Sequence, residues 1–297
     1  VLFKLMKIGI ISQGVHIYST RRIVEAAKDR GHEVTVFDAR DCALHIEKQN
    51  PDIYYLNQKL ETFDAVIPRI GSTAAEQILA VLRQLELQGI YSINSSSAIS
   101  IASDKLRTLQ ILSKKEIGIP LSGFVYQKTD AASAIKRVGG APIIIKLLDG
   151  AEGKGVILAE SNKTALAIID TLKFAKKQTL LQRFVSESKG SDIRAFVVGD
   201  QVVAAMRRKA IEGEFRSNVH RGGSTELVKI DQNFIDTAIR TAKIIGLEVA
   251  GVDMLETAEG PQVLEINASP GLEGIEKCTG VNIADLIVQH LEKRTPY

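Results

Sequence analysis

The stretch VAGVDMLE (249–256) is followed closely by QVLEINASPG (262–271), and these two segments decide the fold of the last third of the chain. Both are apolar runs of strand length, and the Glu-Gly pair at 259–260 between them is typical of an antiparallel hairpin. A second hairpin is expected around the Gly-Asp pair at 199–200, which also lies between two apolar runs. We therefore expect the last third to be an antiparallel α+β unit.

The same two segments carry polar side chains. Side chains two positions apart in a strand point to the same face, so Glu265 and Asn267 should project together while Leu264 and Ile266 pack the other way. Asp253 lies on the neighbouring strand. Two carboxylates and a carboxamide are oxygen ligands that suit Mg²⁺ shared with substrate phosphates. A solvated polar face is the alternative and explains Glu265 alone better, but Asn267, an uncommon residue in a strand, favours the metal site.

The first third of the chain alternates between strand and helix patterns. Apolar runs predict strands at 7–13, 33–38, 65–70 and 91–94, and helical periodicity predicts helices at 20–30 and 74–87. This alternation is typical of an open α/β layer with mostly parallel strands. The serines at 95–97 are expected to cap one helix that runs to about Glu116 and ends before Gly118 and Pro120, which marks a domain junction.

A second unit and the last third follow this junction. Strands are predicted at 124–126, 143–147, 156–159, 180–185, 193–198, 201–207, 248–256 and 262–267, and helices at 131–138, 163–174, 233–245 and 283–293. The sequence contains neither an internal repeat nor a low-complexity tract.

The segment IIIKLLDGAEGKGV (143–156) places one lysine inside an apolar strand and a glycine-rich loop directly after it. Burial of an unpaired ammonium is costly, so Lys146 needs a counter-charge such as a nucleotide phosphate. Gly150, Gly153 and Gly155 would let backbone N–H groups approach the same oxygens. A lysine that extends from a strand end to solvent is an equally good explanation of this segment alone. The loop matches neither the P-loop nor the dinucleotide-binding pattern.

Arginines are concentrated beside small polar residues in the last third. Arg194, Arg207, Arg208, Arg216 and Arg221 lie within about thirty residues, the last two in a loop that ends in two glycines. Guanidinium groups bind phosphates and carboxylates through paired N–H donors. Scattered solvated arginines are the alternative, which the grouping disfavours. The pattern indicates phosphoryl chemistry, in which catalysis depends largely on positioning and charge neutralisation.

Composition excludes several other classes of protein. The 297 residues carry a net charge of +3, which is too small for the broad positive field of a nucleic-acid-binding protein. Cys42 and Cys278 have no partner at zinc or redox spacing, which favours a reduced, cytoplasmic setting, and no apolar run approaches membrane-spanning length. The five histidines are too scattered for a metal cluster, although His220 lies among the arginines. Neither a Gly-x-Ser-x-Gly motif nor a cysteine nucleophile is evident.

Taken together, these residues resemble the ATP-grasp superfamily, and more closely the RimK family of glutamate ligases that modify the sixth protein of the small ribosomal subunit. The resemblance covers nearly the whole chain. It rests on the motifs PRIG (68–71), ASDK (102–105), IKL (145–147) with its glycine loop, SDIR (191–194), GEFRSN (213–218) with HRGG (220–223), AGVD (250–253) and EINASPGLEGIE (265–276).

The resemblance implies an α/β and α+β protein with an ATP-grasp fold behind an N-terminal open, Rossmann-like pre-ATP-grasp domain. The expected domains are 1–95, 96–186 with the glycine loop, and 187–297 with the metal site. It implies ATP-binding roles for Lys105, Lys146, Gly150, Gly153, Gly155, Gln182, Arg183, Phe184, Val185, Asp192, Arg216, Ser217 and Asn218, metal-binding roles for Asp253, Glu265 and Asn267, catalytic roles for Arg194, Arg207 and Arg216, and substrate-binding roles for Arg69 and Arg221.

The resemblance also implies chemistry and partners. The expected cofactors are ATP and two Mg²⁺ or Mn²⁺ ions. The expected substrates are L-glutamate and a protein C-terminal carboxylate, which would be joined through an acyl phosphate. The protein is expected to be a cytoplasmic homo-oligomer that contacts neither nucleic acid nor membrane. The sequence departs from the family at position 183, where Arg183 replaces the usual Glu. Backbone contacts to adenine tolerate this change, but a contribution of the side chain at this position to adenine selectivity stays open. The alternatives are a ligase for another acid, such as a carrier protein or a coenzyme, and a nucleotide-binding module without catalysis.

Overall fold

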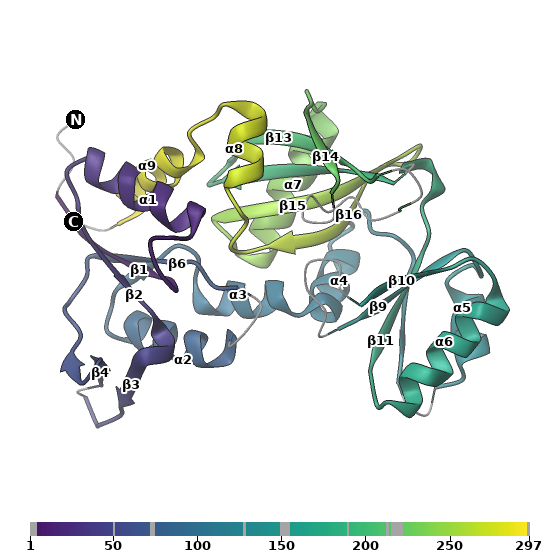
Figure 1. Ribbon diagram of the computed structural model, residues 1–297, viewed down its shortest axis with the longest axis horizontal. Coiled ribbons are helices and arrows are strands. Elements are labelled where there is room, and N and C mark those ends of the chain that lie inside the picture. Colours follow the sequence, from purple (N-terminus) through teal and green to yellow (C-terminus); the bar gives the residue numbers. More distant parts are fainter. Residues whose placement is uncertain are drawn as a thin grey trace.

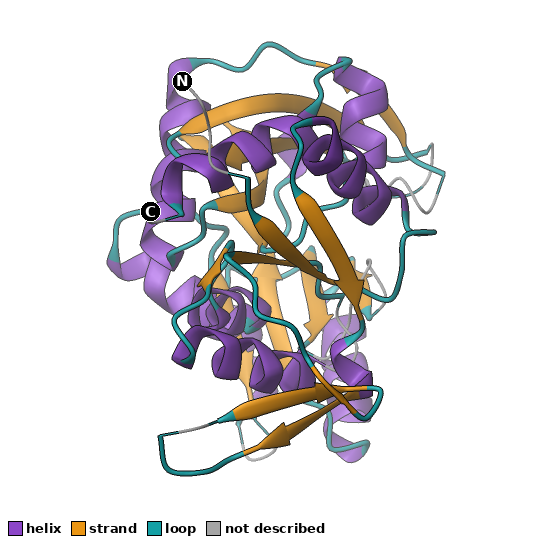
Figure 2. Cartoon of the chain, turned by 90° about the vertical axis from the view of Figure 1, so that its left-hand side faces the viewer, coloured by secondary structure: helices purple, strands orange, loops and turns teal. Residues whose placement is uncertain are grey.

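The computed structural model describes residues 5–49, 51–71, 75–126, 129–148, 155–188, 190–211, 214 and 222–295. Its first unit is an open sheet whose strands are all parallel and ordered β2-β1-β6-β7, as the alternating pattern predicts (Figure 1). The strands are β1 (Lys7–Ile11), β2 (Glu33–Phe37), β6 (Ala65–Pro68) and β7 (Tyr91–Ser92), and the helices are α1 (Tyr18–Asp29) and α2 (Ala75–Leu87). In Figure 2, which shows this side of the molecule, helices flank the strands.

Two features of this part of the chain differ from the prediction. A short turn, η1 (Ala39–Asp41), leads into a small antiparallel sheet of β3 (Cys42–His45), β4 (Asp52–Tyr55) and β5 (Gln58–Lys59), whose strands of two to four residues are too short to give a clear strand signal. The single helix predicted after residue 95 is two helices, α3 (Ser96–Ser103) and α4 (Lys105–Lys114). Asp104 separates them because its backbone is extended and its side chain accepts from the Arg107 N–H as the N-cap of α4.

The central unit is an antiparallel sheet ordered β10-β9-β11-β8, with α5 and α6 on its outer face (Figure 1). The elements are β8 (Ser122–Val125), α5 (Ala131–Arg137), β9 (Ile143–Leu147), β10 (Val156–Ala159), α6 (Asn162–Phe174) and β11 (Thr179–Arg183). Ile143 and Ile145 are fully buried in the core beneath the helices. Since strand side chains alternate, Lys146 points to the opposite, inner face, where Gln182 also lies.

The last unit is a five-stranded antiparallel sheet ordered β14-β13-β12-β15-β16, and both predicted hairpins are present. The elements are η2 (Ser186–Ser188), β12 (Ser191–Val198), β13 (Gln201–Lys209), β14 (Ser224–Leu227), α7 (Gln232–Ile245), β15 (Val249–Thr257), β16 (Gly260–Asn267), α8 (Glu273–Thr279) and α9 (Ile283–Arg294). Ile266 packs into the core against α7, but a register shift after Asp253 pairs Met254 with Val263, so Val263 takes the core position expected for Leu264.

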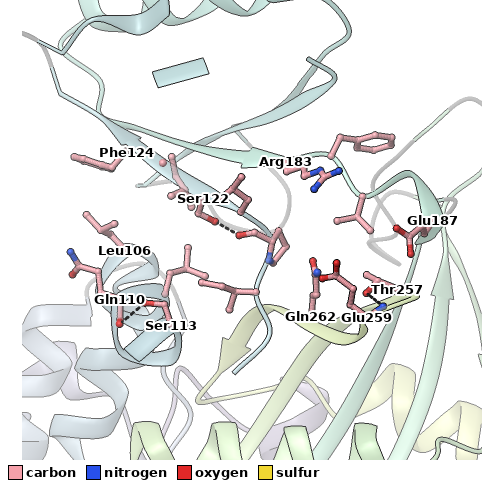
Figure 3. A pocket seen from close by; sticks show the side chains of 18 of the residues that line it. Leu106, Gln110, Ser113, Ser122, Phe124, Arg183, Glu187, Thr257, Glu259 and Gln262 are labelled. Carbon is pink, nitrogen blue, oxygen red and sulfur yellow. Dashed lines mark hydrogen bonds between the residues drawn. The ribbon is translucent and has the colours of Figure 1, made fainter. Parts of the chain in front are cut away.

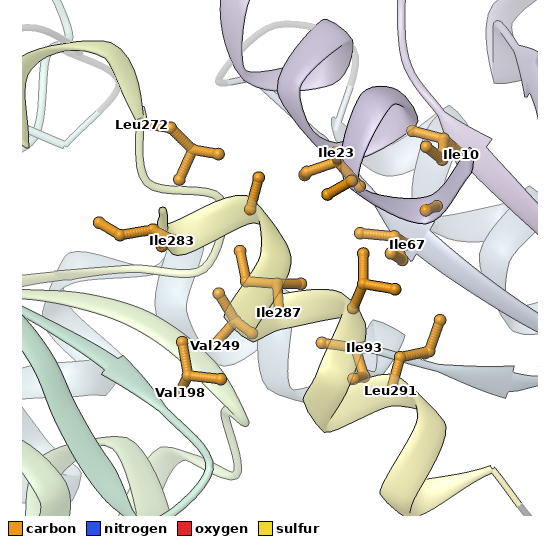
Figure 4. Packing of buried hydrophobic residues seen from close by; sticks show 14 of the residues in the cluster. Ile10, Ile23, Ile67, Ile93, Val198, Val249, Leu272, Ile283, Ile287 and Leu291 are labelled. Atoms are coloured by element: carbon orange, nitrogen blue, oxygen red, sulfur yellow. The ribbon is translucent and has the colours of Figure 1, made fainter. Parts of the chain in front are cut away.

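A shared hydrophobic core joins the first and last units. Ile10, Ile23 and Ile67 pack with Ile287 and Leu291 of α9 in one buried cluster (Figure 4). At its edge, the Arg30 guanidinium donates to both carboxylate oxygens of Glu292, at 2.8 and 2.7 Å. The first sheet is therefore fixed to the end of the last unit, next to the strand that carries Glu265 and Asn267. Each helix in the described part of the chain is too short or too polar to cross a bilayer.

Candidate functional site

The three residues expected to bind a metal converge on one face of the β15–β16 hairpin. Asp253 is paired with Glu265, and Gly251 with Asn267, so the three side chains lie on neighbouring positions. With its amide oriented to satisfy both neighbours, Asn267 donates to Glu265 Oε1 at 3.3 Å and accepts from Arg194 Nη2 at 3.2 Å. This oxygen-rich set fits a hard divalent cation. Among the described residues no three His, Cys, Asp or Glu side chains form a metal-binding group.

Asp253 is the centre of a buried charge network. Arg194 donates from Nε to Oδ1 and from Nη2 to Oδ2, both at 2.7 Å, and Arg208 Nη2 also lies 2.7 Å from Oδ2. Burial raises the pKa of the Asp253 carboxyl, but the two guanidinium groups more than offset this effect and lower the pKa to about 2. Asp253 is therefore an anion, and both of its carboxylate oxygens accept hydrogen bonds from arginine.

Arg208 belongs to the arginine group of the sequence analysis, but it was given no individual role there. It donates to both oxygens of Asp192, at 2.7 and 2.6 Å, and is almost fully buried between Asp192 and Asp253. Arg207, which was expected to be catalytic, pairs in register with Ile193 on the α7 face of the sheet and forms ion pairs with Glu256 and Glu226. Strand alternation separates the two arginines, but only the β12–β13 register decides which one shares a face with Asp192.

Lys146 lies close to the same anions from the opposite sheet. Burial lowers the pKa of its ammonium, which the negative charges of Glu265, Asp253 and Asp192 partly counteract. Lys105, the first residue of α4, lowers it further, and the Lys105 Nζ donates to the Leu148 carbonyl at 3.4 Å. Lys146 forms no ion pair with a described residue, and its ammonium lies within the electrostatic influence of Lys105 and of three carboxylates of the last unit.

A cavity of about 570 Å³ borders the connection between the two sheets. Figure 3 shows Leu106 and Gln110 of α4 on one side, Ser122 and Phe124 of β8 above, and Arg183 opposite. Phe184 and Val185 also line this cavity.

The neighbouring Gln182 is buried, and its amide donates to Ser122 Oγ at 3.0 Å. The Gln182 Oε1 is buried with no hydrogen-bond partner among the described residues. An acceptor in this position would be satisfied by an N–H donor of a bound molecule.

Arg69 extends from the carboxyl end of β6 toward the exit of the metal-candidate strand. Its Nη2 donates to the carbonyls of Ser269, at 3.3 Å, and Pro270, at 2.7 Å. Its Nε is buried and has no partner in the described part of the chain, and burial lowers the pKa of this guanidinium to about 10. A partly satisfied buried cation at the carboxyl end of a parallel strand is suited to an anionic ligand.

The remaining expected site residues divide into two groups. Gly155 adopts a positive φ of 75° at the start of β10, and a Cβ there would lie 3.0 Å from the Leu147 side chain, so glycine is required where the loop rejoins the sheet. Six further candidates lie outside the described residues: Gly150, Gly153, Arg216, Ser217, Asn218 and Arg221.

Comparison with known proteins identifies both parts of the chain. Residues 6–99 match the RimK PreATP-grasp domain and residues 102–291 the RimK-like ATP-grasp domain. A "Probable alpha-L-glutamate ligase" of Vibrio cholerae serotype O1 is 50% identical over 97% of this chain and 96% of its own length. Another protein of that name, from Rhodopirellula baltica, is 52% identical over 98% of this chain and 72% of its own length.

Solved structures show the same fold. The ATP-grasp ligase PsnB, in a complex with a phosphomimetic variant of its minimal precursor, Mg and ADP, superposes with a TM-score of 0.74 at 23% identity, covering 99% of this chain and all of PsnB. A D-alanine–D-alanine ligase from Bacillus anthracis superposes with a TM-score of 0.68 at 16% identity, covering 97% of this chain and 96% of the ligase.

Proposed function

The chain belongs to the RimK family of ATP-grasp proteins and is an ATP-dependent ligase, and we propose that it adds L-glutamate to the C-terminal carboxylate of a protein, namely the sixth protein of the small ribosomal subunit. The structural observation that carries the proposed chemistry is that Arg194 and Arg208 contact Asp253 while the charge of Asp253 also acts on Lys146 from the central sheet. The choice of glutamate follows the names of relatives that are about half identical.

ATP is proposed to bind between the two sheets. The hinge from Gln182 to Val185 is proposed to hold adenine, since the unsatisfied Gln182 Oε1 is an acceptor for the exocyclic amine of that base. Lys105 and Lys146 would neutralise the phosphates, together with the glycine loop and the Arg216 to Asn218 segment. Asp192 would face the nucleoside while Arg208 holds its carboxylate in place.

Asp253, Glu265 and Asn267 fit a pair of Mg²⁺ ions because all three offer hard oxygen ligands on adjacent strand positions. Bound Mg²⁺ would neutralise charge on the phosphates during transfer. Arg194 contacts both Asp253 and Asn267, two of the proposed metal ligands. Its guanidinium is therefore suited to hold the transferred phosphoryl group as well as the carboxylate of the acceptor.

The reaction proposed for this site has two steps. A carboxylate oxygen of the acceptor attacks the γ-phosphorus of ATP, an acyl phosphate forms and ADP leaves. The amine of glutamate then attacks the acyl carbon, the C–N bond forms, and inorganic phosphate and a proton are released. The protein supplies charge neutralisation and alignment without a covalent nucleophile. Arg208 is better placed than Arg207 to stabilise the phosphoryl group, since Arg207 is paired on the other face of the sheet.

On the acceptor side, Arg69 and Arg221 are proposed to bind substrate carboxylates. The available Nε of Arg69 and its position beside the exit of the metal strand support this role. Glutamate brings two carboxylates and the acceptor a third, which explains the need for several guanidinium groups.

The test is to incubate the protein with Mg-ATP, L-glutamate and the ribosomal protein and to record intact masses. We expect the acceptor to gain glutamyl units in uniform steps that disappear without ATP. If the acceptor is unchanged while a different acid drives ADP release with glutamate, the ribosomal assignment is wrong and the ligase chemistry remains. If no pair of acid and amine drives ADP release, a nucleotide-binding module is the correct description.

A further inference from the structure

We infer that Asn94, in the first unit of the chain, is a positioning residue for the metal-binding strands of the last unit. Asn94 lies between β7 and α3 and is only 2% exposed. Its backbone carbonyl accepts from Ser92 Oγ at 2.8 Å, which fixes the segment that presents its side chain. The inference rests on the metal site of the proposed function and assigns a role to a residue outside that site.

The carboxamide of Asn94 uses both of its polar atoms twice. Its Oδ1 accepts from the backbone N–H groups of Glu248 and Val249, at 2.7 and 2.9 Å. Its Nδ2 donates to the backbone carbonyls of Val249 and Ala268, at 2.7 and 2.8 Å. All four partners are backbone groups of the last unit, so the side chain acts as a bridge and not as a surface contact.

The bridge lies at the point where the β15–β16 ladder ends. The last backbone pair joins Gly251 of β15 to Asn267 of β16, and beyond it the two strands separate. The Asn94 carboxamide can bond to both segments beyond this pair because it offers two N–H donors and an oxygen that accepts two bonds. It thereby holds Val249 at the start of β15 and Ala268 directly after Asn267.

The hydrogen bond from Asn94 to Ala268 is one residue away from the proposed metal ligand Asn267. Ala268 is the next residue after Asn267, so a shift of its carbonyl moves the Asn267 side chain. Mg²⁺ requires near-ideal octahedral geometry with ligand distances of about 2.0–2.1 Å, so small displacements weaken binding. Ile93 and Val249 belong to the same buried cluster, which leaves little freedom for the bridge to move (Figure 4).

Other residues of the first unit hold the same loop. Ile70 N–H donates to Ser269 Oγ at 3.2 Å, and Ser19 Oγ accepts from the Leu272 N–H at 3.0 Å. Together with Arg69 on the Ser269 and Pro270 carbonyls, these contacts fix every residue from Ala268 to Leu272 except Gly271. The first unit therefore determines where the metal-binding strand ends, and Asn94 is the member of the group that bridges both strands.

The test is Asn94→Asp in the full-length protein. Aspartate keeps the two bonds accepted from Glu248 and Val249 but loses both donated bonds, and it places an anion against the Ala268 carbonyl. The control is Gln84→Ala, because Gln84 is also a buried carboxamide of the first unit that donates to two backbone carbonyls, of His45 at 3.1 Å and Asp52 at 2.6 Å, in the small β3–β4–β5 sheet.

Both variants should lower the melting temperature, but only Asn94→Asp should weaken metal binding. With a non-hydrolysable ATP analogue bound, we expect the Kd for Mn²⁺, measured from the electron paramagnetic resonance signal of free Mn²⁺, to rise by about tenfold, as for other residues that orient metal ligands. The Mg²⁺ concentration for half-maximal ADP release should rise in parallel. If Asn94→Asp does not fold, Asn94→Ser, which keeps one donor, should show the same shift to a smaller extent.

An Mn²⁺ affinity equal to that of the wild type in folded Asn94→Asp or Asn94→Ser, with a loss of stability like that of Gln84→Ala, would overturn the inference and leave the proposed function intact. A wild-type complex that binds no Mn²⁺ would overturn the proposed metal site and this inference together.

Discussion

Replacing Lys146 by methionine is expected to stabilise the fold while it weakens nucleotide binding. Methionine keeps the length of the side chain and removes a charge whose pKa is lowered by burial and which has no ion pair within the described residues. Replacing a buried charge by an apolar side chain of similar volume is commonly neutral or stabilising, so we expect a gain of about 1 kcal/mol in the free energy of unfolding. A hydrogen bond from a charged group contributes about 1.5–3 kcal/mol, so the Kd for ATP should rise by about 10- to 100-fold.

Urea unfolding without nucleotide and calorimetric titration with an ATP analogue measure the two effects. Because burial lowers the Lys146 pKa in the folded protein, the destabilising effect of its charge is relieved as the pH rises from the folded-state pKa toward about 10.4, the value of a free lysine. The advantage of Lys146→Met should therefore shrink as the pH approaches 10. Lys163→Met, at an exposed lysine of α6, should change neither quantity. A destabilised Lys146→Met with unchanged ATP affinity would show that Lys146 only extends to solvent.

Three further predictions follow from the structure. Glu265→Gln and Asn267→Ala should each raise the Mg²⁺ concentration needed for ADP release, and wild-type Mg²⁺ dependence in both would place the metal elsewhere. Glu292→Gln should cost about 1.5–3 kcal/mol at pH 7 because the Arg30 guanidinium loses its paired, charge-assisted bonds to the Glu292 carboxylate and keeps only the weaker contact with Asp285 among the carboxylates of α9. Since pairing lowers the pKa of Glu292, this contribution is lost as the pH falls, so urea midpoints of the variant and the wild type should converge below about pH 4; a constant difference would refute the assignment. Gly118→Ala should lower the urea midpoint by the equivalent of about 1–3 kcal/mol, since a Cβ there would lie 2.6 Å from the backbone oxygen of Pro261 at the start of β16. An unchanged midpoint would mean that the segment around Gly118 shifts to accommodate the methyl group.

The sequence by itself determined the elements whose signals are local. Apolar runs of strand length located Lys146 in β9 and the metal candidates on β15 and β16, and the short turns at 199–200 and 259–260 identified the two hairpins. These features depend only on neighbours along the chain, so the pattern of apolar residues was sufficient. Long ordered motifs then identified the family.

The tertiary structure decided which of these residues share a site. Arg208, and not Arg207, meets Asp253 because of the β12–β13 register, and the register shift after Asp253 moves Leu264 out of the core. Asn94 bonds to β15 and to the end of β16 across more than 150 residues of sequence. No local pattern encodes such contacts, because they form only when separate units pack together and each buried backbone group must find a partner.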